Sequence, residues 1–139
     1  MEDKQIKEDL EKLAQELEGD FTDYPNQGVT ITISVGNYRY QSIKTFIRDK
    51  DRENHRKMLT FSSIICKLSQ YEIADFRPFL HLNNGLDYAR VALTEDGTLE
   101  IVSSINHQLY SMEEIRYMLL EIAHTADKLE QEITKKDIY

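Results

Sequence analysis

The sequence predicts an α+β domain in which an antiparallel sheet is flanked by helices, in the order helix, three strands, helix, two strands, helix. Residues 29–68 keep an apolar period of two for long enough to form three successive strands. An Asp-Gly pair joins two later strand-like runs, and apolar spacings of three and four residues mark a helix at each end of the chain. A chain of 139 residues suits a single domain, which we place at 1–139.

The first helix is expected within residues 1–19. Ile6, Leu10, Leu13 and Leu17 follow one another by four, three and four positions, which lines one stripe of a helix, and Gly19 is a suitable end. Two interpretations of the stripe remain open. The leucines either cover one side of the sheet or form a ridge that binds a partner.

The strand predicted most clearly is residues 29–35, where β-branched aliphatic residues alternate with hydroxyl residues. One face of this strand is therefore suited to burial and the other to water. The preceding residues 20–28 contain Pro25, Asn26 and Gly28, so we expect a turn-forming link between the helix and the sheet.

Two more strands are expected to complete the region 29–68. Residues 38–47 follow a Gly-Asn turn and place Tyr38, Tyr40 and Phe46 on one face, which suggests either ordinary sheet packing or a flat aromatic surface for a bound segment. Residues 58–68 are apolar on both sides. We therefore expect this strand to lie centrally and to be covered on both faces.

A short helix is predicted at 75–85. Asp75 is a plausible N-cap, Pro78 fits the first turn, and Gly85 can end the helix. The helix has four large apolar residues, namely Phe76, Phe79, Leu80 and Leu82. Some of them should face a second surface, either the edge of the sheet or another subunit.

A hairpin at 87–104 and a long helix at 111–134 complete the predicted elements. The hairpin pairs residues 88–93 with 98–103 through the Asp-Gly turn. Ser111 and Glu114 form the capping-box pattern, and an apolar stripe follows for about five turns. The stripe consists of Ile115, Met118, Leu119, Ile122, Ala126, Leu129 and Ile133.

Composition argues against several classes of protein. A net charge of −8 repels phosphate backbones, and the one run with a basic excess, residues 48–57, mixes both signs as solvated hairpin tips do. We therefore do not expect nucleic acid as a partner. We do not expect a membrane either, because the acidic N-terminal region lacks a signal-like apolar segment and no stretch approaches the roughly 18 apolar residues that a membrane span requires. The single cysteine, Cys66, lies among apolar residues and fits a buried thiol in a reducing, cytoplasmic compartment.

The sequence contains no recognisable reaction centre. His55, His81, His107 and His124 fall in different elements, and none is spaced from another as metal ligands are. Glu121 and His124 form one Glu-x-x-His pair, but a carboxylate-bridged metal centre needs a second pair on a four-helix frame. We therefore predict no catalytic residue, no metal and no cofactor.

A resemblance to a known family rests on residues 79–101, FLHLNNGLDYARVALTEDGTLEI, together with the order of elements. The chain resembles type III secretion chaperones of the CesT and YbjN type, a group of small acidic bacterial proteins. The resemblance implies a homodimer that binds an extended segment of a protein partner on apolar sheet and helix surface. It implies dimer-interface candidates Phe76, Phe79 and Leu82, and partner-binding candidates Leu10, Leu13, Leu17, Ile31 and Ile33.

The leading hypothesis is a non-enzymatic, chaperone-like protein-binding module. One rival is a small ligand-binding domain or enzyme, which would gather His81, His107 or His124 with carboxylates in a pocket. A structural subunit of a larger assembly is a third possibility.

Overall fold

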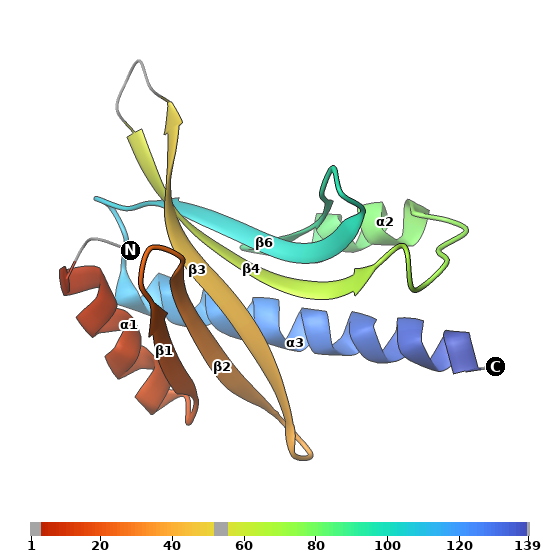
Figure 1. Ribbon diagram of the computed structural model, residues 1–139, viewed down its shortest axis with the longest axis horizontal. Helices are drawn as coiled ribbons and strands as arrows, with labels where there is room; N and C mark the ends of the chain where they lie inside the picture. Colours follow the sequence, from red (N-terminus) through yellow and green to blue (C-terminus); the bar gives the residue numbers. More distant parts are fainter. Residues whose placement is uncertain (1–3, 52–55, 139) are drawn as a thin grey trace.

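The computed structural model describes residues 4–51 and 56–138 of the chain. It is an α+β structure in which a six-stranded antiparallel sheet packs against helices, as Figure 1 shows. The elements are α1 (Lys4–Glu16), β1 (Asp20–Tyr24), β2 (Gly28–Gly36), β3 (Arg39–Asp51), β4 (Arg56–Lys67), α2 (Arg77–Gly85), β5 (Arg90–Leu93), β6 (Thr98–Asn106) and α3 (Met112–Ile138). The predicted class and helix order are confirmed, and one strand is added.

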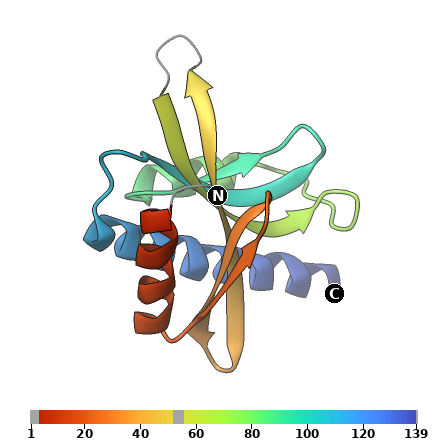
Figure 2. The same ribbon diagram turned by 60° about the vertical axis from the view of Figure 1, so that its left-hand side comes forward.

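The sheet has the strand order β1-β2-β3-β4-β6-β5, and each neighbouring pair is antiparallel. β4 lies between β3 and β6, so its predicted central position is confirmed. β3 and β4 are the longest strands and project beyond the rest of the sheet (Figures 1 and 2). They extend into the predicted loop 48–57, of which residues 52–55, including His55, lie outside the described residues.

The added strand is β1, which lies in the segment predicted to be a link. It pairs with β2 so that Phe21 lies opposite Ile31, and its other four residues are exposed. An exposed edge strand needs no apolar alternation, because its backbone bonds to β2 hold it in place. Asn26 and Gly28, with φ of 65° and 88°, allow the tight turn between the two strands.

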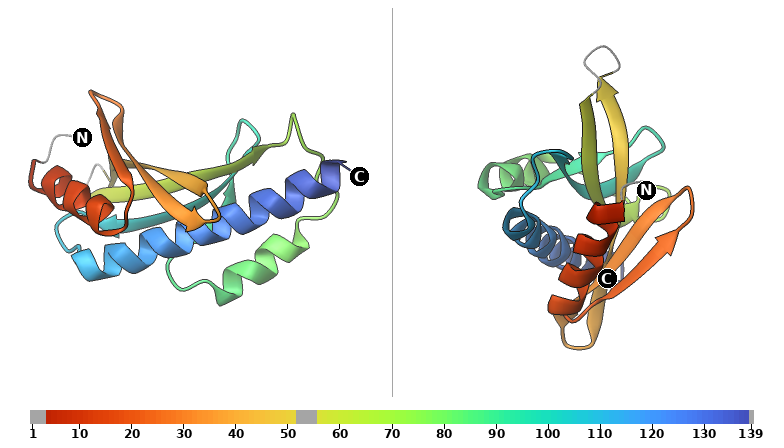
Figure 3. Two further views of the ribbon diagram at one scale, coloured as in Figure 1. Left: turned by 90° about the horizontal axis from the view of Figure 1, so that it is seen from below. Right: turned by 90° about the vertical axis from the view of Figure 1, so that its left-hand side faces the viewer.

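All three helices lie on one side of the sheet (Figure 3). The core therefore forms between α1, α3 and the inner sheet face, where Phe61, Ile101 and Leu119 are fully buried. None of the described helices combines the length and the apolar character that crossing a bilayer requires.

The proposed partner-binding candidates lie in this core. Leu10, Leu13, Ile31 and Ile33 are at most 3% exposed, and Leu17 packs partly buried against them. Because α1 covers the inner face of β2, these side chains are core residues in this structure and do not form a surface open to a partner. Of the two interpretations of the first helix, coverage of the sheet fits.

The prediction that β4 is covered on both faces is wrong, since Ile64 is 57% exposed. The reason is a register shift between Ile64 and Cys66, opposite Glu100 and Leu99 of β6. Ile65 and Cys66 are both only 5% exposed, so the inward positions change from odd to even numbers at this bulge. A one-sided strand with a bulge therefore resembles, in sequence, a strand that is apolar on both sides.

Two details of the turns and caps also differ. Tyr38 lies in the turn before β3 with φ of 60° and is 97% exposed, so it does not share a strand face with Tyr40. Phe76, rather than Asp75, is at the N-cap of α2, although the Asp75 carboxylate accepts a hydrogen bond of 3.0 Å from the Arg77 amide. At α3 the Ser111 hydroxyl accepts the predicted bond from the Glu114 amide, at 3.4 Å.

Candidate binding groove

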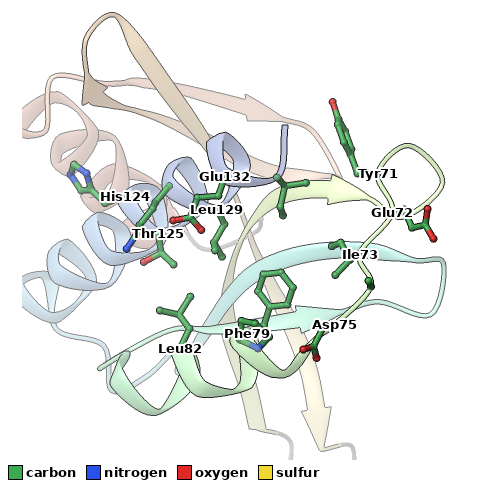
Figure 4. A pocket seen from close by; sticks show the side chains of 14 residues that line it. Tyr71, Glu72, Ile73, Asp75, Phe79, Leu82, His124, Thr125, Leu129 and Glu132 are labelled. Atoms are coloured by element: carbon green, nitrogen blue, oxygen red, sulfur yellow. The ribbon is translucent and has the colours of Figure 1, made fainter. Parts of the chain in front are cut away.

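A groove of about 730 Å³ lies between α2, the segment that leads into it, and the C-terminal half of α3 (Figure 4). We call it the α2–α3 groove. Its apolar lining comes from three parts of the chain: Tyr71 and Ile73 before α2, Phe79 and Leu82 on α2, and Leu129 and Ile133 on α3. A concave site of this size with a mainly apolar lining has the character of ligand-binding and peptide-binding sites.

The groove exists because α2 is held by polar contacts at its C-terminal end. No residue of α2 is buried. The Asn83 side chain accepts a hydrogen bond of 2.7 Å from the Val91 amide and donates one of 3.3 Å to the Val91 carbonyl. Asn83 thus pairs with the free edge of β5 as a neighbouring strand would, which also protects that edge.

Glu121 of α3 fixes the connection from α2 to β5. Its carboxylate accepts three backbone hydrogen bonds, from the amides of Asp87 at 3.0 Å, Tyr88 at 2.8 Å and Ala89 at 2.8 Å. Bonds to a carboxylate are stronger than bonds between neutral groups. Glu121 is therefore a structural anchor, and sequence reasoning gave no signal of this role.

Charged groups surround the apolar lining. Asp75 is tied to Arg77 by a 2.9 Å ion pair, and this guanidinium holds the pKa of the Asp75 carboxyl below its usual value. Glu72 and Glu132 line the groove with Lys128 and are exposed. Charges of both signs therefore surround a site whose centre is apolar.

The structure does not bring the described histidines together. His124 lines the groove and His81 is exposed on α2. His107 follows β6, and its Nδ1 atom is buried with no hydrogen-bond partner in the described part of the chain. The Glu-x-x-His pair is divided, because Glu121 binds the backbone at residues 87–89 while His124 lies at the groove. Within residues 4–51 and 56–138, no group of three potential metal ligands is found.

Only two of the three dimer-interface candidates line the groove, although the Phe76 ring, at the N-cap of α2, lies 6.1 Å from the Phe79 ring, centroid to centroid. Phe79 and Leu82 line the groove, whereas Phe76 is 38% exposed and Leu80, four positions further on, is 67% exposed. We call Phe76 and Leu80 the α2 ridge. The groove residues that sequence reasoning missed are Tyr71 and Ile73, whose only signal was two large apolar residues inside a predicted connection.

A separate polar cluster joins β3 to α3 on the face of the sheet that the helices cover. Arg39 donates two hydrogen bonds of 3.1 Å to the carboxylate of Asp127, and this contact lowers the pKa of Asp127. Gln41 donates to Glu130 at 2.9 Å in the next turn of the helix.

Cys66 is buried as predicted, and burial raises the pKa of its thiol.

Comparison of the chain with models of known protein families and with curated proteins finds no match. The resemblance to type III secretion chaperones therefore stays a prediction.

Proposed function

We propose that this protein is a non-enzymatic, chaperone-like protein-binding module whose α2–α3 groove binds an apolar segment of a partner protein. The observation that carries the proposal is the apolar lining from α2, α3 and the segment before α2, which the chain's own described side chains do not fill. Covering the apolar residues of a concave site with a partner removes their surface from water, which lowers the free energy and favours binding.

The exposed side of α2 supports a second part of the proposal, a homodimer. Phe76 and Leu80 place two large apolar side chains one helical turn apart on the surface. Exposed apolar ridges of this kind are typical of protein interfaces. On this proposal the ridge binds a second copy and the groove binds the partner, in the cytoplasm.

The polar groups at the groove favour binding over catalysis. Asp75, which lines the groove, is engaged by Arg77 and is therefore not free for proton transfer to a substrate. Glu72, His124 and Glu132 lie exposed around the site, where water solvates them.

A displayed library of random peptides tests the groove. We expect selection to yield peptides rich in large apolar residues that bind the wild-type protein. Substitution Phe79→Asp should weaken them by about tenfold or more, because it places a charge in the apolar lining. The matched control Leu109→Asp changes a residue that is 77% exposed outside the groove, and it should leave binding unchanged.

Peptides that bind Phe79→Asp as tightly as the wild type, with both proteins folded by circular dichroism, would show that the groove is not the site. A library that yields no binder at all would remove the proposal and leave a small apolar ligand as the occupant to examine. Sedimentation equilibrium tests the dimer separately: the variant Phe76→Asp/Leu80→Asp should sediment as a monomer where the wild type sediments as a dimer, and a monomeric wild type would refute this part.

A further inference from the structure

The sheet forks between β3 and β4. In the described part of the chain these strands pair along residues 44–51 and 56–62, whereas residues 39–43 of β3 pair with β2 alone and residues 63–67 of β4 pair with β6 alone. The two arms diverge, and α3 passes across the opening between them (Figure 1). We call this opening the fork. It interrupts the sheet at a place where a continuous sheet would cover α3.

Buried polar side chains occupy the vertex of the fork. Gln41 of β3 and Ser63 of β4 are 7% and 1% exposed. The Ser63 hydroxyl donates a hydrogen bond of 2.9 Å to the backbone carbonyl of Ser42, and its Oγ atom also lies 3.3 Å from the Gln41 Oε1 atom. A side chain thus satisfies a β3 carbonyl that a neighbouring strand would bind in a continuous sheet. Specific bonds between the two arms therefore stabilise the opening.

Glu130 of α3 lies at the fork without a cationic partner. Its carboxylate is half-buried and accepts a hydrogen bond of 2.9 Å from the Gln41 side-chain amide. About one helical turn earlier, Asp127 is paired with Arg39, but no lysine or arginine nitrogen of the described residues lies within 4 Å of the Glu130 carboxylate. A carboxylate can accept about four hydrogen bonds, and a partly buried charge is unfavourable without a counter-charge. A cation supplied by another molecule would therefore bind favourably at Glu130.

Glu130 is accessible from the side of the sheet that carries no helices (Figure 3). A hollow of about 1050 Å³ on this side is lined by residues of β2 to β6, and Gln41, Ser63 and Glu130 line it at the fork. We call it the outer hollow. Tyr40 and Ile64, on the two arms of the fork, also line it and are 58% and 57% exposed. The site thus combines a carboxylate with an aromatic side chain on one arm and an aliphatic side chain on the other.

The lining of the outer hollow has one more carboxylate than it has cations. The carboxylates are Glu95, Asp96, Glu100 and Glu130, and the cations are Lys44, Arg48 and Arg90. Arg90 interacts with Glu100, and the Lys44 amine lies 6.0 Å from the centre of the Phe46 ring, which is two residues further from the fork. Arg48 lies further still along β3. None of the three cations neutralises Glu130 and the chain carries −8, so a cationic ligand is complementary to the fork.

A long basic side chain matches this arrangement. Lysine and arginine carry their charge at the end of an aliphatic stem, which packs on exposed apolar side chains while the charged group reaches a polar partner. Tyr40 adds an aromatic face that attracts a cation. We propose that the outer hollow binds an extended peptide segment with one basic residue, whose charged group pairs with Glu130 and whose stem packs between Tyr40 and Ile64. The site lies on the opposite side of the sheet from the α2–α3 groove, so it does not depend on the function proposed for the groove.

A free polyamine fits the outer hollow less well. Several amines in one ligand would bring further positive charges towards Lys44 and Arg48, where like charges repel. The hydroxyl groups of Ser42 and Ser62, which line the hollow, can donate hydrogen bonds to the carbonyl groups of a peptide, whereas a protonated polyamine has no acceptor for them. A peptide segment with a single cation avoids the repulsion and uses the hydroxyl groups.

Fluorescence anisotropy with two labelled peptides tests the inference. Both peptides consist of threonine and valine around a central residue, which is lysine in the first and norleucine in the second, so that the second keeps the stem and lacks the charge. In low salt, about 50 mM, the lysine peptide should bind about fivefold more tightly than the norleucine peptide. Glu130→Gln can keep the bond to Gln41 but loses the charge, so it should weaken the lysine peptide by about fivefold and leave the norleucine peptide unchanged.

The matched control is Glu132→Gln, which removes the same charge from α3 at the α2–α3 groove and should leave both affinities unchanged. Tyr40→Ala removes an exposed side chain that contacts the stem and should weaken both peptides by about threefold. Circular dichroism checks that each variant is folded.

Four results would overturn the inference: equal binding of the two peptides, an unchanged affinity with Glu130→Gln or Tyr40→Ala, an equal loss with Glu132→Gln, or no binding at about 1 mM peptide. Spermidine that displaces the lysine peptide and binds more tightly than it would overturn the inference in favour of a free polyamine.

Discussion

Replacing Glu121 by glutamine should loosen the connection between α2 and β5. In the wild type one carboxylate oxygen accepts bonds from the Tyr88 and Ala89 amides, and the other accepts the Asp87 amide. Glutamine keeps one acceptor oxygen but loses the charge, and its NH₂ group faces an amide donor. With about 1.5 kcal/mol for a hydrogen bond to a charged group, the loss of one bond and the weakening of two others lowers the free energy of unfolding by about 2–3 kcal/mol.

Urea denaturation followed by circular dichroism measures this loss. For an m value of about 1.5 kcal/mol/M, the unfolding midpoint should fall by about 1.3–2 M. The control Glu132→Gln changes an exposed carboxylate of the same helix and should shift stability by less than about 0.5 kcal/mol. Hydrogen exchange of the amides at residues 87–89 should accelerate only in the Glu121 variant. Equal midpoints and equal exchange in the two variants would refute the anchoring role.

Three further predictions concern the core and the turns. Arg39 holds the pKa of Asp127 below its unfolded value, so their ion pair stabilises the fold above about pH 4 and this stabilisation is lost as the pH falls further. Asp127→Asn should lower the free energy of unfolding by about 1 kcal/mol at pH 7, a modest value because Arg39 is 41% exposed. In urea titrations the difference in unfolding free energy between variant and wild type should shrink below about pH 4. The Cys66 thiol should react slowly with a disulfide reagent in the native protein and rapidly in urea, and equal rates would contradict its burial. Gly28→Ala should lower the melting temperature, because its φ is +88° and a Cβ would lie 2.4 Å from a carbonyl oxygen, whereas Gly85→Ala, with open space around it, should not.

Local periodicity explains why much of the fold could be predicted. The alternation in residues 29–35 and the apolar stripe of residues 115–133 record which face of a strand or helix is buried, and both correspond to β2 and α3. The Asp96-Gly97 turn likewise joins β5 to β6, where Gly97 has φ of +83°. In each case the deciding interactions lie within a few residues along the chain.

The errors arise where the deciding contact is distant in sequence or breaks the period. β1 depends on backbone pairing with β2 and leaves no apolar pattern of its own. The bulge at Ile65 reverses the inward positions of β4, so a strict count of alternate residues assigns Cys66 to the wrong face. The role of Glu121 depends on amides more than thirty positions away.

The groove itself follows from such distant contacts, which the sequence pattern of α2 alone could not reveal. A short helix with four large apolar residues would be expected to pack directly on α3 and close the space between them. Instead, Asn83 fixes the C-terminal end of α2 to β5, and Glu121 fixes the connection that follows. Because these directional bonds set the position of α2 while Phe79 and Leu82 remain only partly buried, the apolar surface stays open. A partner segment that covered this surface would bury the apolar area of Phe79 and Leu82 that the protein's own chain leaves exposed, and this burial would favour binding.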